Sequence, residues 1–304
     1  MRLVALGEAM VELCETEAPG LMQMGFAGDT LNTAWYLKRL RPDWNVEYVT
    51  NVGHDTMSYR LVTFLMDAGL GTSHIGRHPT RGVGLYMIAT EGGERHFSYW
   101  RSRSAARTFA DDRARLDAAF AKADMVYLSG ITLAILDVVA RAHLMEALRN
   151  ARASGSTIAF DPNLRPELWP DPDVMRGAVM QMAELADIAL PSHEDEANWF
   201  GDTDARATAL RYAAVGATTV IVKDGARDVV SHHTGTTTLY PVTASTKVVD
   251  TTAAGDSFNA GVLSAIGGGA SVGEAVRAGA SLARRVIAGR GALVAEAVPK
   301  TVSA

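Results

Sequence analysis

Short apolar runs alternate with longer segments of helical periodicity, and this alternation is what most limits the folds open to the chain. The apolar runs occupy residues 3–6, 46–50, 125–129, 157–160, 188–190 and 220–223. The helical patterns occupy residues 32–40, 57–68, 133–153, 174–186 and 206–215. Strands that are short, apolar on both faces and separated by helices form a parallel sheet with helices on both sides. The sequence therefore predicts a three-layer α/β fold with a mostly parallel central sheet.

Composition limits the partners and the location of the protein. Of the 304 residues, 48% are hydrophobic and 21% are charged, which is typical of a globular chain that buries its own core. The net charge of -5 disfavours a nucleic-acid partner. Cys14 is the single cysteine, so no intrachain disulfide is expected, and this fits a reducing cytosol. There is no signal-peptide pattern and no run of about 18 apolar residues, so we expect no membrane partner and a cytoplasmic location.

A β-hairpin is predicted where the pattern changes to a period of two, in residues 83–101. A two-residue turn at Gly92-Gly93 would place Tyr86 opposite Tyr99, on one face together with Arg101. Neither face has the composition of plain solvent surface. We therefore expect the hairpin to cover something on one side and to pack against a partner on the other.

The remaining organisation is simple. Residues 228–242 form a second strand–turn–strand pattern, which we expect to be an antiparallel edge of the main sheet. No proline- or serine-rich linker divides the chain, so residues 1–304 are predicted to form a single domain.

The strongest chemical signal lies in residues 250–256, which read Asp-Thr-Thr-Ala-Ala-Gly-Asp. A strand pattern ends here and a helical pattern follows. Small side chains let an anion approach the backbone N–H groups at a helix N-terminus, where the helix dipole also favours phosphate. Asp256 would then lie beside that anion and could take a proton from an attacking hydroxyl. A purely structural reading is that Asp256 only caps the helix.

Residues 250–256 resemble the C-terminal signature of the ribokinase (PfkB) family of carbohydrate kinases, although the family usually has glycine where this chain has Ala253. Residues 27–34 resemble the N-terminal signature, and the two stand in the family's order. The resemblance implies a ribokinase-like fold with a small β-lid built from residues 9–27 and 81–103. It also implies that Asp256 is the catalytic base and that the phosphoryl donor is ATP. The backbone amides of the anion hole would be those of Ala253, Ala254 and Gly255, with Asp256 next to them.

A finer resemblance is to the bacterial 2-keto-3-deoxygluconate kinases, and it implies phosphorylation of that sugar acid to its 6-phosphate. The matching stretches are residues 28–33, 84–86, 99–101 and 160–169. The substrate-binding residues expected from it are Gly28, Asp29, Asn32, Tyr86, Tyr99, Arg101 and Arg165. A guanidinium can hold the substrate carboxylate through two hydrogen bonds, and tyrosine rings can cover the sugar.

Several of these assignments have alternatives. Arg101 stands in Arg-Ser-Arg-Ser, which alone indicates solvated surface, and Tyr86 and Tyr99 could simply stabilise the hairpin. Arg165 could serve the nucleotide phosphates as well as the sugar. The alternative functions are a neutral-sugar kinase such as a fructokinase, and a non-catalytic sugar-binding protein, against which the intact Asp256 argues.

The nucleotide site is expected at residues 222–227, which follow a strand and resemble the family's ATP loop, with Asp228 in place of a usual glycine. The expected ATP-binding residues are Asn163, Arg165, Lys223, Gly225 and Gly255. The family's metal-linked Asn-x-x-Glu appears as Ser192 and Asp195. Mg²⁺ is therefore expected to arrive with ATP, with Asp195 contacting it through water.

The remaining expectations concern motifs that the sequence lacks, two glutamates near the first strand, and assembly. There is no G-x-x-x-x-G-K-[ST] motif, which excludes a P-loop kinase, and no histidine spacing typical of zinc. Glu8 or Glu12 could approach the lid or be plain surface. By analogy with the family, a homodimer through the β-lid is expected.

Overall fold

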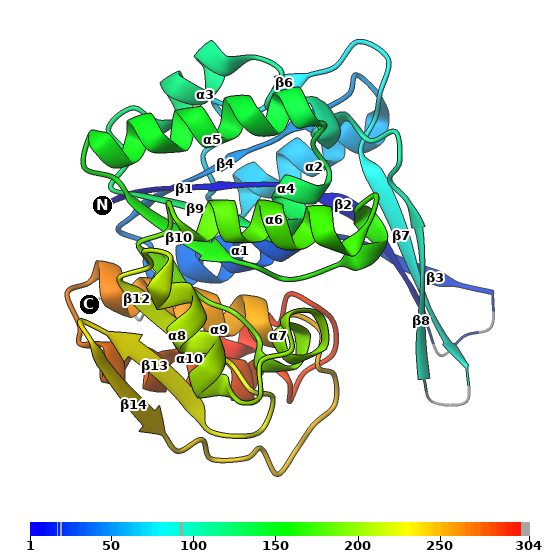
Figure 1. Ribbon diagram of the computed structural model, residues 1–304. Helices are drawn as coiled ribbons and strands as arrows, with labels where there is room; N and C mark the ends of the chain where they lie inside the picture. The colour runs from blue at the N-terminus through cyan, green and yellow to red at the C-terminus, as the bar shows by residue number, and fades with distance from the viewer. Residues whose placement is uncertain (17, 19, 92–93, 299–304) are drawn as a thin grey trace.

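An eight-stranded sheet forms the centre of the computed structural model, which describes residues 1–16, 18, 20–91 and 94–298 (Figure 1). The strand order is β14-β13-β12-β11-β10-β9-β1-β4. The strands are β1 (Arg2–Leu6), β4 (Asn45–Val49), β9 (Met125–Ser129), β10 (Thr157–Asp161), β11 (Ile188–Ala189), β12 (Thr219–Val222), β13 (Val229–His233) and β14 (Thr236–Tyr240). From β4 to β12 neighbouring strands are parallel, whereas β13 and β14 are antiparallel. The predicted parallel sheet and its antiparallel edge are both confirmed.

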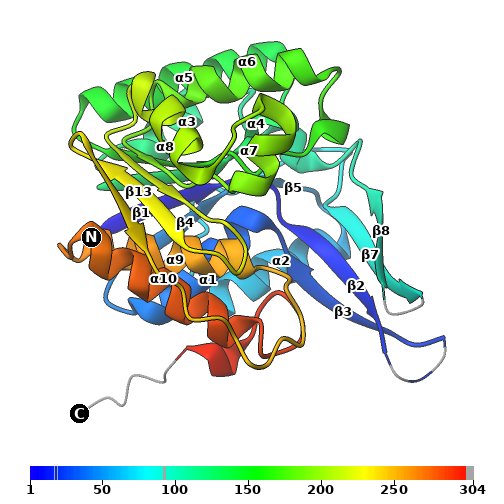
Figure 2. The same cartoon turned by 60° about the horizontal axis from the view of Figure 1, so that its bottom comes forward.

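Helices cover both faces of this sheet, as Figures 1 and 2 show. One layer contains α3 (Arg113–Phe120), α4 (Gly130–Ala134), α5 (Val138–Ala153), α6 (Pro172–Ala183) and α8 (Ala205–Ala214). The other contains α1 (Asp29–Leu40), α2 (Thr56–Asp67), α9 (Ala254–Gly267) and α10 (Val272–Val286). Each layer has its own hydrophobic core against the sheet, centred on residues such as Phe160 on one side and Tyr127 on the other. The three-layer prediction is therefore confirmed.

The prediction of one helix over residues 133–153 is wrong. The helix α4 ends at Ala134, and α5 begins at Val138. Between them Asp137 adopts an extended backbone and its side chain accepts a hydrogen bond of 2.8 Å from the amide of Ala140. An aspartate that accepts a hydrogen bond from a free backbone amide in this way starts a new helix. The apolar pattern therefore runs through residues 133–153 although they form two helices.

A second sheet projects from one end of the main sheet (Figure 2). Its strand order is β3-β2-β7-β8. The strands are β2 (Met10–Glu15), β3 (Met22–Ala27), β7 (Gly84–Glu91) and β8 (Glu94–Trp100), from the two segments expected to build a lid. Tyr86 lies opposite Tyr99, so the predicted hairpin register is confirmed. The turn expected at Gly92-Gly93 lies outside the described residues.

The base of this second sheet is buried and its outer strand is exposed. Tyr86 and Ile88 are 7% and 4% exposed, and they form a cluster with Met10, Ala27 and Ala292. Tyr99 and Trp100, on opposite faces of β8, are 50% and 58% exposed. The sheet is therefore fixed to the body of the protein at one end only.

The remaining elements are short. They are α7 (His193–Phe200), the paired strands β5 (Asn51–Val52) and β6 (Gly76–Arg77), and 3-10 turns at Ala105–Thr108, Pro166–Leu168 and Ala295–Ala297. In the part of the chain that the structure describes, no helix combines the length and the apolar character needed to cross a bilayer.

Candidate active site

The loop before α9 is shaped by a buried aspartate. Asp250 is 4% exposed and its carboxylate accepts hydrogen bonds from the amides of Thr252 (2.9 Å) and Gly291 (2.6 Å). The helix α9 is then entered through Ala253, which has φ 58° and ψ 18°. This is the left-handed region that favours glycine, so the alanine carries a backbone strain that glycine would not.

The first turn of α9 has backbone amides that could bind an anion, and they differ in part from the amides expected from the sequence. The amide of Ala254 donates to the carbonyl oxygen of Thr251 at 3.1 Å, within the turn that leads into the helix. The amides of Gly255 and Asp256 belong to the first helical turn, where N–H groups have no acceptor inside the helix. These two are therefore the amides best placed for an anion, together with the positive end of the helix dipole.

Asp256 lies beside these amides and is held by α1. Its Oδ2 accepts a hydrogen bond of 2.8 Å from Nδ2 of Asn32. Although the residue keeps some solvent exposure, its carboxyl lies deep in the protein, and this burial raises the pKa of Asp256 to about 8. The nearby negative charge of Asp29 raises the pKa further, while the bond from Asn32 lowers it. A carboxyl group with a pKa near neutrality is suited to proton transfer at physiological pH.

The residues around Asp256 come from distant parts of the chain, namely the start of α1, which follows β3 of the second sheet, and the segment after β10. Asp29 Oδ2 accepts a hydrogen bond of 2.8 Å from Nδ2 of Asn163, which follows β10. Gly28 directly precedes α1 and packs against the chain that follows β1. A Cβ at position 28 would lie 2.2 Å from the carbonyl oxygen of Glu8. Residues predicted from separate motifs, namely Gly28, Asp29, Asn32, Asn163 and Asp256, thus lie in one place.

The predicted sugar-binding arginine Arg101 is not a surface residue. Its side chain is 10% exposed and forms an ion pair with Glu8, which is 1% exposed. Nε of Arg101 donates to Glu8 Oε2 at 2.8 Å, and Nη2 donates to the same oxygen. The alternative readings of Arg101 and of Glu8 as solvated surface are therefore wrong.

Tyr86 and Tyr99 lie opposite each other on the second sheet. Tyr86 donates to the carboxylate of Glu12, and burial together with that negative charge raises its pKa. Burial also raises the pKa of Tyr99, whereas the positive charges of Arg101 and Arg165 lower it. Cζ of Arg101 lies 5.8 Å from the centroid of the Tyr99 ring. The ring centroids of Tyr86 and Tyr99 are 5.9 Å apart. These side chains provide aromatic surface and positive charge at one location.

Arg165 and Asp195 face one another. Arg165 is partly exposed, donates 2.6 Å to the carbonyl oxygen of Leu164, and has Nη1 3.8 Å from Asp195 Oδ2. Burial raises the pKa of Asp195, and Arg165 opposes that shift. Among residues 1–298, where the structure describes them, there is no group of three or more His, Cys, Asp or Glu side chains that could hold a metal ion.

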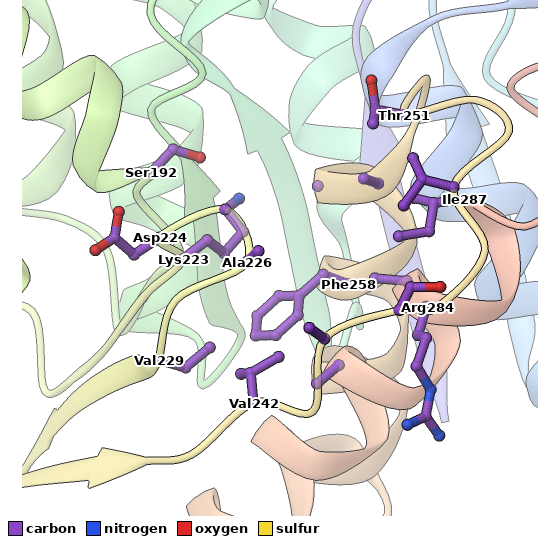
Figure 3. A pocket seen from close by; sticks show the side chains of 18 of the residues that line it. Ser192, Lys223, Asp224, Ala226, Val229, Val242, Thr251, Phe258, Arg284 and Ile287 are labelled. Atoms are coloured by element: carbon purple, nitrogen blue, oxygen red, sulfur yellow. The ribbon is translucent and has the colours of Figure 1, made fainter.

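A cavity of about 520 Å³ opens next to the first turn of α9. Figure 3 shows the Phe258 ring between the loop that begins at Lys223 and the end of α10 near Arg284. Of the predicted ATP-binding residues, Lys223, Gly225 and Gly255 line it, whereas Asn163 and Arg165 do not. Its walls also include the apolar residues Val229, Val242, Val248, Phe258, Ala280, Ala283 and Ile287.

Asp228, which replaces a usual glycine of the family, has a visible role at this cavity. Its Oδ1 accepts a hydrogen bond of 3.2 Å from the amide of Val242, so it fixes one wall. The departure from the family pattern therefore leaves the cavity intact.

Sequence reasoning missed a group of buried polar residues behind the site. Lys223 donates to Asp161 Oδ2 (2.9 Å) and to Asn259 Oδ1 (3.0 Å), and Asn259 donates to Tyr127 (3.1 Å). Asn259 lies three residues after Asp256, on the same face of α9, and that spacing was the one available signal. Thr33 and Asp161 lie in stretches that carry the family resemblance but were assigned no role there, and Tyr127 reads only as part of an apolar strand.

Nearly the whole chain is similar to carbohydrate kinases. The model of the pfkB family carbohydrate kinases matches residues 2–297. The 2-dehydro-3-deoxygluconokinase of Dickeya dadantii (strain 3937) is 39% identical over 307 residues, covering 98% of each chain. The enzyme of the same name from Escherichia coli (strain K12) is 38% identical over 308 residues, covering 98% of this chain and 99% of that one.

Two solved structures of similar fold cover nearly the whole chain. A PfkB protein from Polaromonas sp. JS666 has a TM-score of 0.83 at 30% identity and covers 94% of this chain and 95% of its own. A fructokinase with bound ATP from Xylella fastidiosa also has a TM-score of 0.83, at 25% identity, over 98% and 95% of the two chains.

Proposed function

Because the chain belongs to the pfkB family of carbohydrate kinases, we propose that it phosphorylates 2-keto-3-deoxygluconate (2-dehydro-3-deoxygluconate) at the 6-hydroxyl with ATP. Relatives with 38% and 39% identity that extend over nearly the whole chain bear the name of this activity. The chain is a carbohydrate kinase. The raised pKa of Asp256 and the amides at the start of α9 support the proposal, because such a kinase needs a proton acceptor and an anion-binding group.

The proton chemistry is assigned to Asp256. The substrate hydroxyl oxygen forms a bond to the γ-phosphorus while the bond from that phosphorus to the ADP oxygen breaks. The hydroxyl proton passes to the ionised carboxylate of Asp256, which Asn32 orients through its 2.8 Å hydrogen bond. The amides of Gly255 and Asp256 at the start of α9 stabilise the negative charge of the transferring group.

The observation that supports a sugar acid is the presence of two guanidinium groups near one tyrosine. Arg101 Cζ lies 5.8 Å from the centroid of the Tyr99 ring, the charge of Arg165 also lowers the pKa of Tyr99, and neither guanidinium would be required for a neutral sugar. We assign the substrate carboxylate to these arginines and the sugar ring to Tyr86 and Tyr99. Gly28, Asp29 and Asn32 are assigned to the part of the sugar nearest Asp256.

The nucleotide is assigned to the 520 Å³ cavity, since its apolar walls suit a base and it ends at the first turn of α9. Magnesium carried by the nucleotide would neutralise charge on the phosphates. We assign Asp195, which faces Arg165 at 3.8 Å, to a contact with this ion through water.

A fructokinase-like activity is the second candidate. A fructokinase of Vibrio alginolyticus is 28% identical over 264 residues, covering 86% of this chain and 82% of that enzyme. A neutral sugar could use the same base and nucleotide site, but it would leave Arg101 and Arg165 without an anionic partner from the substrate.

The deciding experiment measures ADP release with 2-keto-3-deoxygluconate, fructose and ribose. We expect the highest kcat/KM with the sugar acid. Arg101→Ala and Arg165→Ala should lower kcat/KM for the acid at least tenfold more than for fructose, since a charge-assisted bidentate contact is worth about 1.5–3 kcal/mol. Arg103→Ala is the matched control, because Arg103 is exposed in the same segment. Fastest turnover on a neutral sugar would refute the assignment.

Assembly and location complete the proposal. We propose a homodimer through the second sheet, supported by the exposed aromatic residues Phe97, Tyr99 and Trp100 on β8. Trp100→Glu should shift the sedimenting species from dimer to monomer. A cytoplasmic location is proposed as well, and fractionation of cells producing the chain tests it.

A further inference from the structure

Lys223 lines the cavity assigned to ATP, and its ammonium also reaches buried polar partners inside the protein. It is 10% exposed, and Nζ lies 2.9 Å from Asp161 Oδ2 and 3.0 Å from Asn259 Oδ1. The same nitrogen lies 3.9 Å from where a Cβ on Gly255 would be, so the ammonium sits directly beneath the first turn of α9. It therefore approaches the anion site from inside the protein.

A continuous set of hydrogen bonds joins this ammonium to the catalytic residue. Asn259 Nδ2 donates to Asp161 Oδ2 (2.6 Å) and to the hydroxyl of Tyr127 (3.1 Å). Thr33 Oγ1 lies 3.2 Å from that hydroxyl and 3.1 Å from the carbonyl oxygen of Asp256. The lysine, the start of α9 and the base are thus parts of one buried network.

The charges around Asp256 are unbalanced without this lysine. Asp29, at the start of α1, and Asp161, at the end of β10, present negative charge to it, while Asn32 donates a neutral hydrogen bond. Lys223, from the end of β12, is the positive charge that offsets them. Burial favours the protonated carboxyl, whereas a nearby cation favours the ionised form that can accept a proton.

We propose that Lys223 is a positioning residue for phosphoryl transfer, whose buried ammonium is bonded to α9 through Asn259 and supplies the counter-charge that the carboxylate of Asp256 needs. This inference rests on the proposed kinase function and adds a role to a residue of that same site. Asp161 and Asn259 hold the ammonium in place. Removing the positive charge should therefore change proton transfer more than nucleotide binding.

The test compares pH profiles of kcat with saturating ATP and sugar acid. For Lys223→Met we expect the acidic limb of the kcat profile to move to higher pH by about one unit, so that kcat at pH 6.5 falls about tenfold. The KM for ATP should change less than threefold. For Asp161→Asn the acidic limb should move to lower pH, because the negative charge that raises the pKa of Asp256 has been removed. Lys122→Met, an exposed lysine outside the site, is the matched control.

The double variant Lys223→Met/Asp161→Asn keeps the test decisive if the single lysine variant fails to fold, because it leaves no unpaired buried charge. The midpoint of its acidic limb should lie at higher pH than that of Asp161→Asn alone. Limbs that coincide would overturn the proposal, as would a Lys223→Met variant with an unchanged limb and a KM for ATP raised tenfold or more. If the unmodified protein releases no ADP with any sugar, the proposed function fails instead, which separates the two outcomes.

Discussion

Nδ2 of Asn32 donates a hydrogen bond of 2.8 Å to Oδ2 of Asp256, and so joins α1 to α9 across 224 positions of sequence. One residue comes from each end of the chain, and both stand at the beginning of a helix that packs on the same face of the sheet. The bond fixes one carboxyl oxygen and favours the ionised form of the base.

The first prediction concerns this bond. Asn32→Ala should raise the pKa of Asp256 above its value of about 8, because the bond from Asn32 lowers it in the native protein. The acidic limb of kcat/KM for the unmodified enzyme should have its midpoint near pH 8, and the variant's should lie at higher pH. Initial rates of ADP release between pH 6 and pH 10 measure both, and a limb that moves to lower pH would contradict the argument.

The second prediction tests the base itself. Asp256→Asn preserves the shape of the side chain but cannot accept the proton, and general-base catalysis contributes about 10²–10⁴-fold. We expect kcat to fall by that factor while the dissociation constant for ATP, measured by calorimetry, changes little. A variant that retains a tenth of the activity would show that another group takes the proton.

Much of this arrangement could be predicted from the sequence, and the reason is local. Residues 27–34 and 250–256 each carry a strand end, a small-residue turn and a helix start, so their backbone conformation follows from nearby residues. The register that places Tyr86 opposite Tyr99 follows from a two-residue turn in the same way.

What could not be predicted depends on contacts between distant segments. Glu8 reads as the polar residue after a strand, and only the packed structure brings it to Arg101, 93 positions away. Lys223 reads as part of a nucleotide loop, and nothing nearby in the sequence indicates that Asp161 lies within 2.9 Å of it. Side-chain direction at the end of a strand is set by tertiary packing, which local patterns do not contain.

The third prediction links the same base to stability. The pKa of Asp256 is raised from 3.8 to about 8 in the folded protein, so the folded state binds the proton more tightly than the unfolded state. Stability from this group is therefore full below about pH 4 and is lost as the pH rises to about 8. Asp256→Asn should increase Tm only slightly at pH 5 and by several degrees at pH 8.5. Equal differences at both pH values would contradict the shift.

The fourth prediction concerns the strained entry to α9. Ala253 has φ 58°, where a non-glycine residue costs about 1–2 kcal/mol. Ala253→Gly should change the free energy of unfolding by less than about 1 kcal/mol, because relief of strain is offset by the greater freedom of glycine in the unfolded chain. Ala253→Val should cost more than about 2 kcal/mol and should lower kcat, since a β-branched residue resists this conformation. Urea unfolding measures the free energy of unfolding of both variants, and initial rates of ADP release measure kcat.

The matched control for that series is Ala121→Val, at an exposed alanine with φ -55°. It should leave both stability and kcat near their original values. A valine at Ala253 that is no more harmful than one at Ala121 would mean that the loop can adopt another conformation without loss.

The last prediction concerns Glu8, which holds Arg101 through a single carboxylate oxygen. Oε2 accepts from both Nε and Nη2 of Arg101, while Oε1 is buried without a hydrogen-bond partner. In Glu8→Gln the carbonyl oxygen can keep the place of Oε2, and the amide takes the place of Oε1. The guanidinium then loses a competing negative charge, so KM for a sugar acid should fall about threefold or more while KM for fructose stays unchanged. Thermal stability should decrease, because the new amide lacks a partner. Glu184→Gln, at an exposed glutamate, should change none of these values. An unaltered KM for the acid would place its carboxylate away from Arg101.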